Sequence, residues 1–344
     1  MKRLLAIVLV SVMLLSVAAL TGCKKTEPTP VETTADAQTQ AAQETDAAPK
    51  ESAPLALSSF TAKAGDYDLT FEPVDLGFVQ GGESTYEFCG EFANGKYYLS
   101  AEQSKVVYVY ALDGATATLE NKFELEDGYE KISVSPDGDV YLSPGIFESV
   151  ILKDDGTVTK TAFKHDVEWA KDQDFAVTTW VNADPTVIKG GEESPWVFQN
   201  LNDPSKRVGN LSMVFDCEIA DDRVIIAGTY ADGDDDNYRM GIFDFEGNEL
   251  AMTAVDDPVG YPAVGGTKNG IISANVNKLY LHDYDGKPLG SIDGLRSLAG
   301  LDDTVSTFWV KEFSPADDGS VYMLVYTSKK DDTTEALLYK VSGF

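Results

Sequence analysis

The sequence predicts an all-β fold made of a repeated four-stranded unit. Short apolar strands such as residues 97–99, 140–142 and 224–226 follow tight-turn dipeptides, and no segment of residues 58–344 shows helical periodicity. The composition agrees, with 29 glycines and 16 tyrosines. Four short strands in about 40 to 50 residues are typical of a propeller blade.

The number of units follows from a glycine that ends the third strand of each copy. An apolar strand, an acidic residue and a glycine recur at Gly114, Gly156, Gly247 and Gly286, with spacings of 42, 91 and 39 residues. The longest spacing holds two units, because residues 196–203 supply an intervening copy. A last copy at residues 336–343 brings the count to six, so the sequence predicts a six-bladed β-propeller.

The hairpin between the first two strands of each unit also repeats. Asn-Gly and Asp-Gly pairs supply the positive backbone angles that tight hairpins need. The copy near residues 173–179 is the least regular. The others are Asn94-Gly95, Asp137-Gly138, Asp221-Asp222, Asn269-Gly270 and Asp318-Gly319.

An unpaired strand near the start of the domain completes the ring. The last unit stops after its third strand, whereas residues 67–71 alternate as a strand ahead of the first unit. Pairing the two would remove exposed sheet edges. We therefore expect the termini of the domain to meet in blade six.

These motifs resemble those of the six-bladed β-propellers of the TolB-like and NHL-like type. In that family a strand, a Pro-Asp-Gly turn and a Val-Tyr-Leu strand recur in the order seen at residues 131–142. The resemblance covers the whole domain, but its motifs are structural. It therefore implies the fold and not a function.

The N-terminus reads as an export signal. Lys2 and Arg3 precede an uncharged run at residues 4–20, which ends in Leu20-Thr21-Gly22-Cys23. The segment resembles the lipobox of bacterial lipoproteins, which implies that residues 1–22 are removed and that Cys23 carries the lipid, palmitate included. The alternative is a membrane anchor, for which this run is short.

The mature chain is expected to have two parts. Residues 23–57 form a lipid-anchored linker whose polar composition, without aromatic residues, predicts disorder. Residues 58–344 form the propeller, held on the outer face of the cytoplasmic membrane. The net charge of −30 disfavours nucleic acid as a partner, and we expect a monomer.

A rim of aromatic residues is the first candidate binding site. In the resembling family the inner strands line the channel, and the loops that enter them form the binding face. Tyr86, Tyr129 and Tyr261 each lie eight residues before a hairpin turn, with Trp169, Trp309 and His165 nearby. They can hold a peptide or glycan, or they can pack blade against blade.

Two loops on the same face are further candidates, at residues 181–194 and 229–237. The second contains Asp232, Asp234 and Asp236, which alternate as in a calcium loop. The glycine and glutamate of an EF-hand are missing, so a solvated acidic hairpin is the alternative. Apart from this possible Ca²⁺, no cofactor is expected.

The remaining reactive residues form no catalytic motif. No Gly-x-Ser-x-Gly elbow occurs, and His282 reads as a surface residue. The first suspects for a carboxylate site on inner strands are Glu87, Asp216 and Glu218. Cys89 and Cys217 occupy equivalent positions in opposite units, so we expect free, buried thiols.

The predicted function is therefore a non-catalytic one. A surface-anchored propeller would bind or scaffold a protein, peptide or glycan. The alternative is an extracellular hydrolase or lyase of lactonase-like type with a divalent metal in the channel. The two differ in whether channel carboxylates hold a metal.

Overall fold

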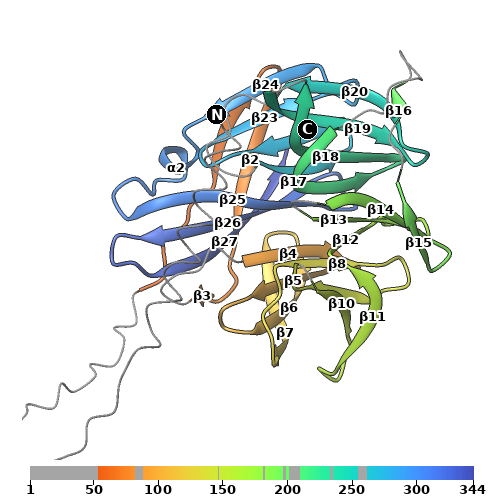
Figure 1. Ribbon diagram of the computed structural model, residues 1–344. Helices are drawn as coiled ribbons and strands as arrows, with labels where there is room; N and C mark the ends of the chain where they lie inside the picture. Colours follow the sequence, from red (N-terminus) through yellow and green to blue (C-terminus); the bar gives the residue numbers. More distant parts are fainter. Residues whose placement is uncertain are drawn as a thin grey trace, which may run out of the picture. The chain divides into compact units, whose positions relative to one another are not determined.

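The protein is an all-β propeller of six sheets, seen in a computed structural model (Figure 1). The structure describes residues 53–81, 88–145, 147–180, 183–196, 199–200, 210–232, 235–254 and 262–344. Residues Ser52–Phe344 form one compact unit. Each sheet contributes its first strand to the channel wall, and these inner strands contact one another in sequence until the sixth meets the first.

Blades 1 to 3 are four-stranded antiparallel meanders. Blade 1 consists of β4 (Phe88–Ala93), β5 (Lys96–Ala101), β6 (Val106–Asp113) and β7 (Thr116–Glu124). Blade 2 consists of β8 (Lys131–Val134), β9 (Val140–Ser143), β10 (Glu148–Leu152) and β11 (Val158–Lys164). Blade 3 consists of β12 (Asp166–Trp169), β13 (Phe175–Trp180), β14 (Ala183–Lys189) and β15 (Glu192–Pro195).

Blades 4 and 5 continue this order. Blade 4 consists of β17 (Asn210–Ala220), β18 (Arg223–Asp232), β19 (Asp235–Asp244) and β20 (Asn248–Ala254), with β16 (Gln199–Asn200) parallel to β20. Blade 5 consists of β21 (Ala263–Thr267), β22 (Gly270–Ala274), β23 (Lys278–His282) and β24 (Pro288–Asp293). A one-turn helix, α2 (Leu295–Leu298), leads from blade 5 into blade 6.

Blade 6 closes the ring with strands from both ends of the chain. Its C-terminal strands are β25 (Val305–Pro315), β26 (Val321–Lys329) and β27 (Thr334–Ser342). Strand β2 (Tyr67–Val74) pairs with β27 through Phe71 and Val341, β1 (Phe60–Ala64) pairs with β2, and the short β3 (Gln80–Gly81) also pairs with β27. In Figure 1 the orange β2 lies beside the blue C-terminal strands. The predicted closure by residues 67–71 is confirmed.

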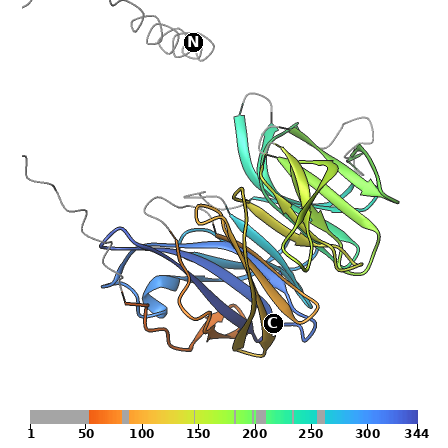
Figure 2. The same cartoon turned by 90° about the horizontal axis from the view of Figure 1, so that it is seen from below.

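The core lies between the blades. Each of six apolar clusters is shared by two neighbouring sheets, because the two faces of a blade pack against the blades on either side of it. The cluster between blades 6 and 1 includes Tyr322 and Leu324 packed near Phe92 and Tyr97. Figure 2 shows the blue strands of blade 6 beside the orange strands of blade 1.

The hairpin turns adopt the conformation that their residues favour. Asn94 and Gly95 have φ angles of 54° and 74°, as in the turn that connects twisted antiparallel strands without splaying them. Strands β4 and β5 pair in register on either side, with Ala93 opposite Lys96. The inner hairpins thus place the ends of the inner strands at one mouth of the channel.

Blade 3 departs from the predicted repeat. Its third strand is β14, followed by a Gly190-Gly191 turn, so the copy assigned to residues 196–203 was wrong. Residues Gln199–Asn200 of that segment pair with blade 4 instead. The predicted loop at residues 181–194 was also wrong, because β14 and β15 occupy most of it.

Two further expectations concern single residues. Cys89 and Cys217 are free and buried, as predicted. His282 was predicted to lie on the surface, but it is only 6% exposed. Its strand β23 is the third of blade 5, and the last two residues of that strand are both buried although a turn follows them.

Candidate functional site

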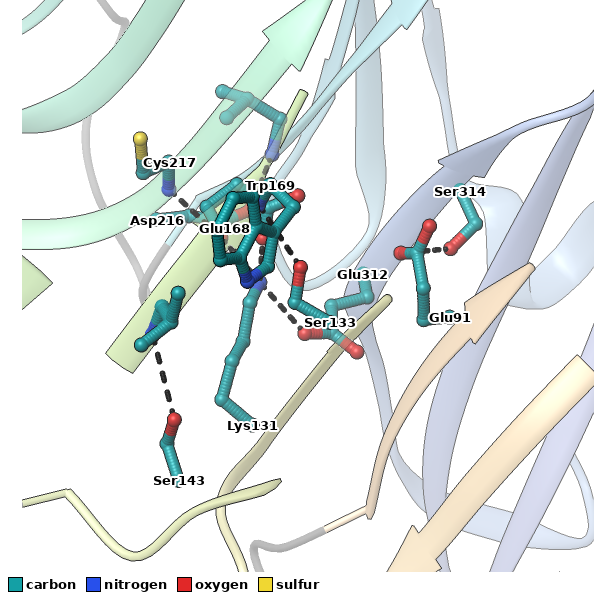
Figure 3. Close-up of polar contacts among 12 residues, drawn as sticks. Glu91, Lys131, Ser133, Ser143, Glu168, Trp169, Asp216, Cys217, Glu312 and Ser314 are labelled. Atoms are coloured by element: carbon teal, nitrogen blue, oxygen red, sulfur yellow. Dashed lines mark hydrogen bonds and ion pairs between the residues drawn. The ribbon is translucent and has the colours of Figure 1, made fainter. Parts of the chain in front are cut away.

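A largely buried lysine lies in the channel. Lys131, the first residue of β8, extends its ammonium group between carboxylates from three other blades (Figure 3). Its Nζ lies 2.9 Å from Glu312, 3.2 Å from Asp216 and 3.7 Å from Glu168. These acidic residues come from β25, β17 and β12, so the cluster joins blades 2, 3, 4 and 6.

The same carboxylates cap backbone groups on neighbouring blades. The Gly90 N–H donates to Glu312 Oε2 at 2.5 Å, and the Val264 N–H donates to Asp216 Oδ2 at 2.9 Å. In each case the acid comes from the preceding blade of the ring. An inner strand has no partner strand on its channel side, so a buried N–H there needs such an acceptor.

Blade 2 supplies a hydroxyl cap in the same direction. Ser133 Oγ accepts a hydrogen bond of 3.0 Å from the Trp169 N–H on blade 3 (Figure 3). Ser133 is buried and follows Lys131 by two residues on β8. Polar residues of the inner strands thus join blade 6 to blade 1, blade 4 to blade 5 and blade 2 to blade 3.

A second polar layer lies further along the channel. Ser314 Oγ donates to Glu91 Oε2 at 3.0 Å, and the Lys171 Nζ lies 4.0 Å from Glu91 Oε1. Lys171 also donates to the backbone carbonyl of Pro315. Lys171 therefore links blade 3 to blade 6 and also forms an ion pair with Glu91 of blade 1.

Burial dominates the electrostatics of these groups. Desolvation raises the pKa of Glu91, Glu168, Glu218 and Glu312, and nearby lysines oppose the shift for each of them. Desolvation acts to lower the pKa of Lys131, but the facing carboxylates outweigh it and hold the pKa well above its usual value. Lys131 is therefore a permanent cation in the channel.

A cavity of about 530 Å³ opens at the mouth where the inner strands begin. Residues on or beside the inner strands of all six blades line it. Phe88, Phe215 and Trp309 form apolar parts of the wall, and Cys89 and Cys217 also line it. Its size and mixed lining are those of a small-ligand pocket.

The carboxyl group of Asp166 is a polar group of this cavity wall. It lies on the wall two residues before Glu168, so both side chains are on the same side of β12. Its Oδ1 atom is buried and has no hydrogen-bond partner among the described residues. Burial raises the pKa of this carboxyl to about 7, partly opposed by Lys131.

A second cavity, of about 780 Å³, lies at the opposite mouth. Its walls are residues of the inner hairpin turns, including Asp221, Asp318 and Gly319. Lys171 and Arg223 also line it. The two cavities lie on either side of the polar layers of the channel.

The central carboxylates do not fit a divalent ion in this arrangement. The Lys131 ammonium already stands between Glu168, Asp216 and Glu312, where a metal shared by these residues would have to lie. Among the described residues no group of three or more His, Cys, Asp or Glu side chains has metal-binding geometry. The cluster instead carries its own cation.

The predicted rim residues fall in two places. Tyr129 packs in the core between blades 1 and 2, and Trp169 packs 5.3 Å from the ring of Tyr141 between blades 2 and 3. Neither lines the cavity. These positions agree with the alternative that such rings pack blade against blade. Tyr86 and Tyr261 lie outside the described residues.

His165 precedes β12 with a φ of 68°, and its backbone bonds to Phe147 and Ser149. Of the other predicted rim residues, Trp309 does line the cavity. The candidate loop at residues 229–237 belongs to the β18–β19 hairpin, in which Ala231 pairs with Asp236. Asp234 and the side chains of Asp232 and Asp236 lie outside the described part of the chain.

Sequence reasoning found part of the central cluster. Asp216 was a suspect and belongs to it, and Glu218 lies two residues further on β17, whereas Glu87 is not among the described residues. It missed Lys131, Asp166, Glu168 and Glu312. The available signal was a charged residue inside an apolar inner strand, as in Lys-Ile-Ser-Val and Asp-Val-Glu-Trp.

The fold and channel define the class as a six-bladed propeller with a polar channel, in which a lysine meets several carboxylates, and a ligand-sized mouth. No family model matches the chain, and no curated protein matches it either. No helix of the described residues is long and apolar enough to cross a membrane.

Known structures of low identity match the chain over most of its length. A gluconolactonase from Xanthomonas campestris is 10% identical, with a TM-score of 0.49 and coverage of 82% of this chain and 91% of that chain. The PQQ-bound aldose sugar dehydrogenase from Streptomyces coelicolor is 12% identical, with a TM-score of 0.48 and coverage of 84% and 99%. At these identities the similarity concerns the fold alone.

Proposed function

We propose that the protein is a membrane-anchored, extracytoplasmic binding propeller whose ligand site is the cavity at the start of the inner strands. The lipid on Cys23 would hold it at the membrane, and the linker before the propeller would let the domain reach its partner. The partner would be a protein, peptide or glycan that inserts one group into the cavity.

The observation that carries this proposal is the cavity of about 530 Å³ with its mixed wall. Aromatic surfaces at Phe215 and Trp309 offer apolar contact, and Asp166 offers a buried acceptor without a partner among the described residues. Pockets that combine apolar walls with a few oriented polar groups are the usual form of a ligand site.

The rival function is a hydrolase or lyase of lactonase-like type, for which a divalent metal among channel carboxylates would polarise the substrate. The position between Glu168, Asp216 and Glu312 is filled by the Lys131 ammonium, which supports the binding hypothesis over the rival. A lysine held by three acids neutralises charge without providing open coordination positions.

A thermal-shift and calorimetric panel tests the site. The chain from Lys24 onward would be titrated with oligosaccharides, muropeptides and short peptides, and the variants Phe215→Ala and Leu119→Ala would be compared. Phe215 lines the cavity, whereas Leu119 is 50% exposed on the outer strand of blade 1. Binding that Phe215→Ala weakens and Leu119→Ala leaves unchanged is expected; the opposite pattern would place the ligand elsewhere.

The anchor is tested separately in cells. Fractionation with labelled palmitate should show the wild-type protein in the membrane and labelled, and the Cys23→Ala variant unlabelled. Label that persists in the variant would disprove acylation at Cys23.

A further inference from the structure

The cavity wall has more negative than positive side chains. Glu130, Asp166, Glu168, Asp216 and Glu312 line it, whereas the basic residues of the wall are Lys131 and Lys311. The whole chain carries a net charge of −30, which raises the concentration of cations near such an opening.

Two of the acids are fully engaged within the protein. Asp216 accepts from Lys131, from its neighbour Cys217 and from the Val264 N–H. Glu312 divides its two oxygens between Lys131 and Gly90. Neither of these carboxylates has a free oxygen for a ligand.

The acids of β12 are different. Asp166 Oδ1 and Glu168 Oε2 are buried and have no hydrogen-bond partner among the described residues. The Glu168 Oε2 atom lies 3.7 Å from the Lys131 Nζ, which is beyond hydrogen-bond distance. An acceptor that is buried without a donor is unfavourable, so an incoming donor would be favoured.

The basic residues of the wall are committed elsewhere. Lys131 is shared among three carboxylates, and the Lys311 Nζ lies 4.7 Å from the centre of the Trp309 ring. The aromatic residues of the same cavity wall suit an apolar chain, and ring faces also attract cations. A ligand with an ammonium at the end of an apolar stem satisfies both parts of the wall.

We propose that the cavity binds an alkylammonium group, with the ammonium donating to Asp166 and Glu168 and its alkyl stem lying against Trp309 and Phe215. The group can belong to a free aliphatic amine or to a lysine side chain of a peptide, which share this chemistry. The inference rests on the proposed function and names the ligand class of the same cavity.

Calorimetric titration with matched pairs of probes tests it. The charged probes are n-pentylamine and Nα-acetyl-lysine amide, and their neutral counterparts are n-pentanol and the same lysine amide acetylated on its side chain. Both charged probes should bind, and both neutral ones should bind at least tenfold more weakly. Binding of the lysine amide alone would identify a peptide as the source of the group. Binding of both charged probes would show that a free aliphatic amine is sufficient.

Two variants locate the binding. Asp166→Asn keeps the shape of the side chain and should weaken the charged probes at least tenfold. Asp285→Asn removes an equal charge from an exposed turn of blade 5 outside the cavity and should have no effect. The comparison of charged and neutral probes on the wild-type protein decides the matter even if Asp166→Asn fails to fold.

Equal binding of charged and neutral probes, no binding of the charged ones, or no effect of a folded Asp166→Asn would overturn the alkylammonium assignment. If an uncharged saccharide or peptide still binds and Phe215→Ala weakens it, the proposed function stands without this inference. If nothing in either panel binds, both are wrong.

Discussion

Lys131 and Glu312 form an ion pair of 2.9 Å across the channel, although they belong to blades 2 and 6. Their side chains are 17% and 10% exposed. The other oxygen of Glu312 binds the Gly90 N–H of blade 1, so this carboxylate links three blades. Such a contact forms only when the ring is closed, so the charges of the channel come together as the propeller closes.

Removing the charge of Lys131 should destabilise the fold strongly. Lys131→Met leaves three buried carboxylates without their cation, and breaking a buried pair costs about 3–5 kcal/mol. The control is Lys153→Met, which removes an exposed pair with Asp139 at 3.3 Å and should cost at most about 1 kcal/mol. Urea unfolding at pH 7 measures both. Equal effects of the two variants would show that the channel pair carries no special energy.

Asp166 should make stability depend on pH. Its pKa in the folded protein, about 7, is above the value near 4 expected in the unfolded chain, so the folded state holds the proton more tightly. Its contribution is therefore full below pH ~4 and is lost as pH rises toward 7, with a slope of up to about 1.4 kcal/mol per pH unit.

The Asp166→Asn variant isolates this effect from other titrating groups. Asp166 senses Lys131, Glu130, Asp216 and Glu312, which remain in the variant. The difference in unfolding free energy between wild type and variant should change between pH 4 and 7, in the direction of a relatively more stable variant at the higher pH. A difference that is constant over this range would contradict the raised pKa.

Gly65 should tolerate no side chain. It has a φ of +62° in the β1–β2 turn, and an added Cβ would overlap the Leu289 carbonyl of blade 5. Gly114 has the same φ of +62° with no atom within 4 Å, so it reports the backbone strain alone. Gly114→Ala should cost about 1–2 kcal/mol and Gly65→Ala at least ~2 kcal/mol more. Thermal and urea unfolding compare them, and equal costs would mean that the turn can move away from blade 5.

The segment before β1 should contribute to stability. The Leu55 N–H donates to Glu335, the Lys329 ammonium donates to the Ala53 carbonyl, and Leu57 packs against the core. The free energy of unfolding of a chain beginning at Ser58 should be about 2–4 kcal/mol lower than that of a chain beginning at Ser52, because partly buried leucine surface is lost.

The ion pair of Lys329 and Glu335, 2.8 Å long, gives this truncation an internal check. In the shorter chain the two side chains lose their backbone partners at residues 53 and 55, so the pair becomes more exposed to water. Hydrogen exchange at the start of β27 should then rise in the shorter chain only. Unchanged exchange and stability would show that the propeller begins after residue 57.

The repeat could be predicted because its signals are local. Asn94-Gly95 and Asp137-Gly138 each predict a hairpin by themselves, and an alternating pattern such as that of residues 67–71 predicts a strand that can pair with another. The third strand of blade 3 was assigned wrongly because it is followed by Gly190-Gly191 without an acidic residue, whereas residues 196–203 resemble the expected pattern. Local similarity could not tell which copy joins which sheet.

The sequence alone therefore determined the all-β class, the number of blades, the closure by the N-terminal strand and the free thiols of Cys89 and Cys217, since each depends on turns and spacing within or between repeats. Only the tertiary structure decided that Lys131 meets Glu168, Asp216 and Glu312, and that Asp166 lines a cavity without a partner among the described residues. The physical reason is that the axis of a ring is shared by strands far apart in the chain. Which charges meet there depends on the twist and register of every blade, and no single repeat contains that information.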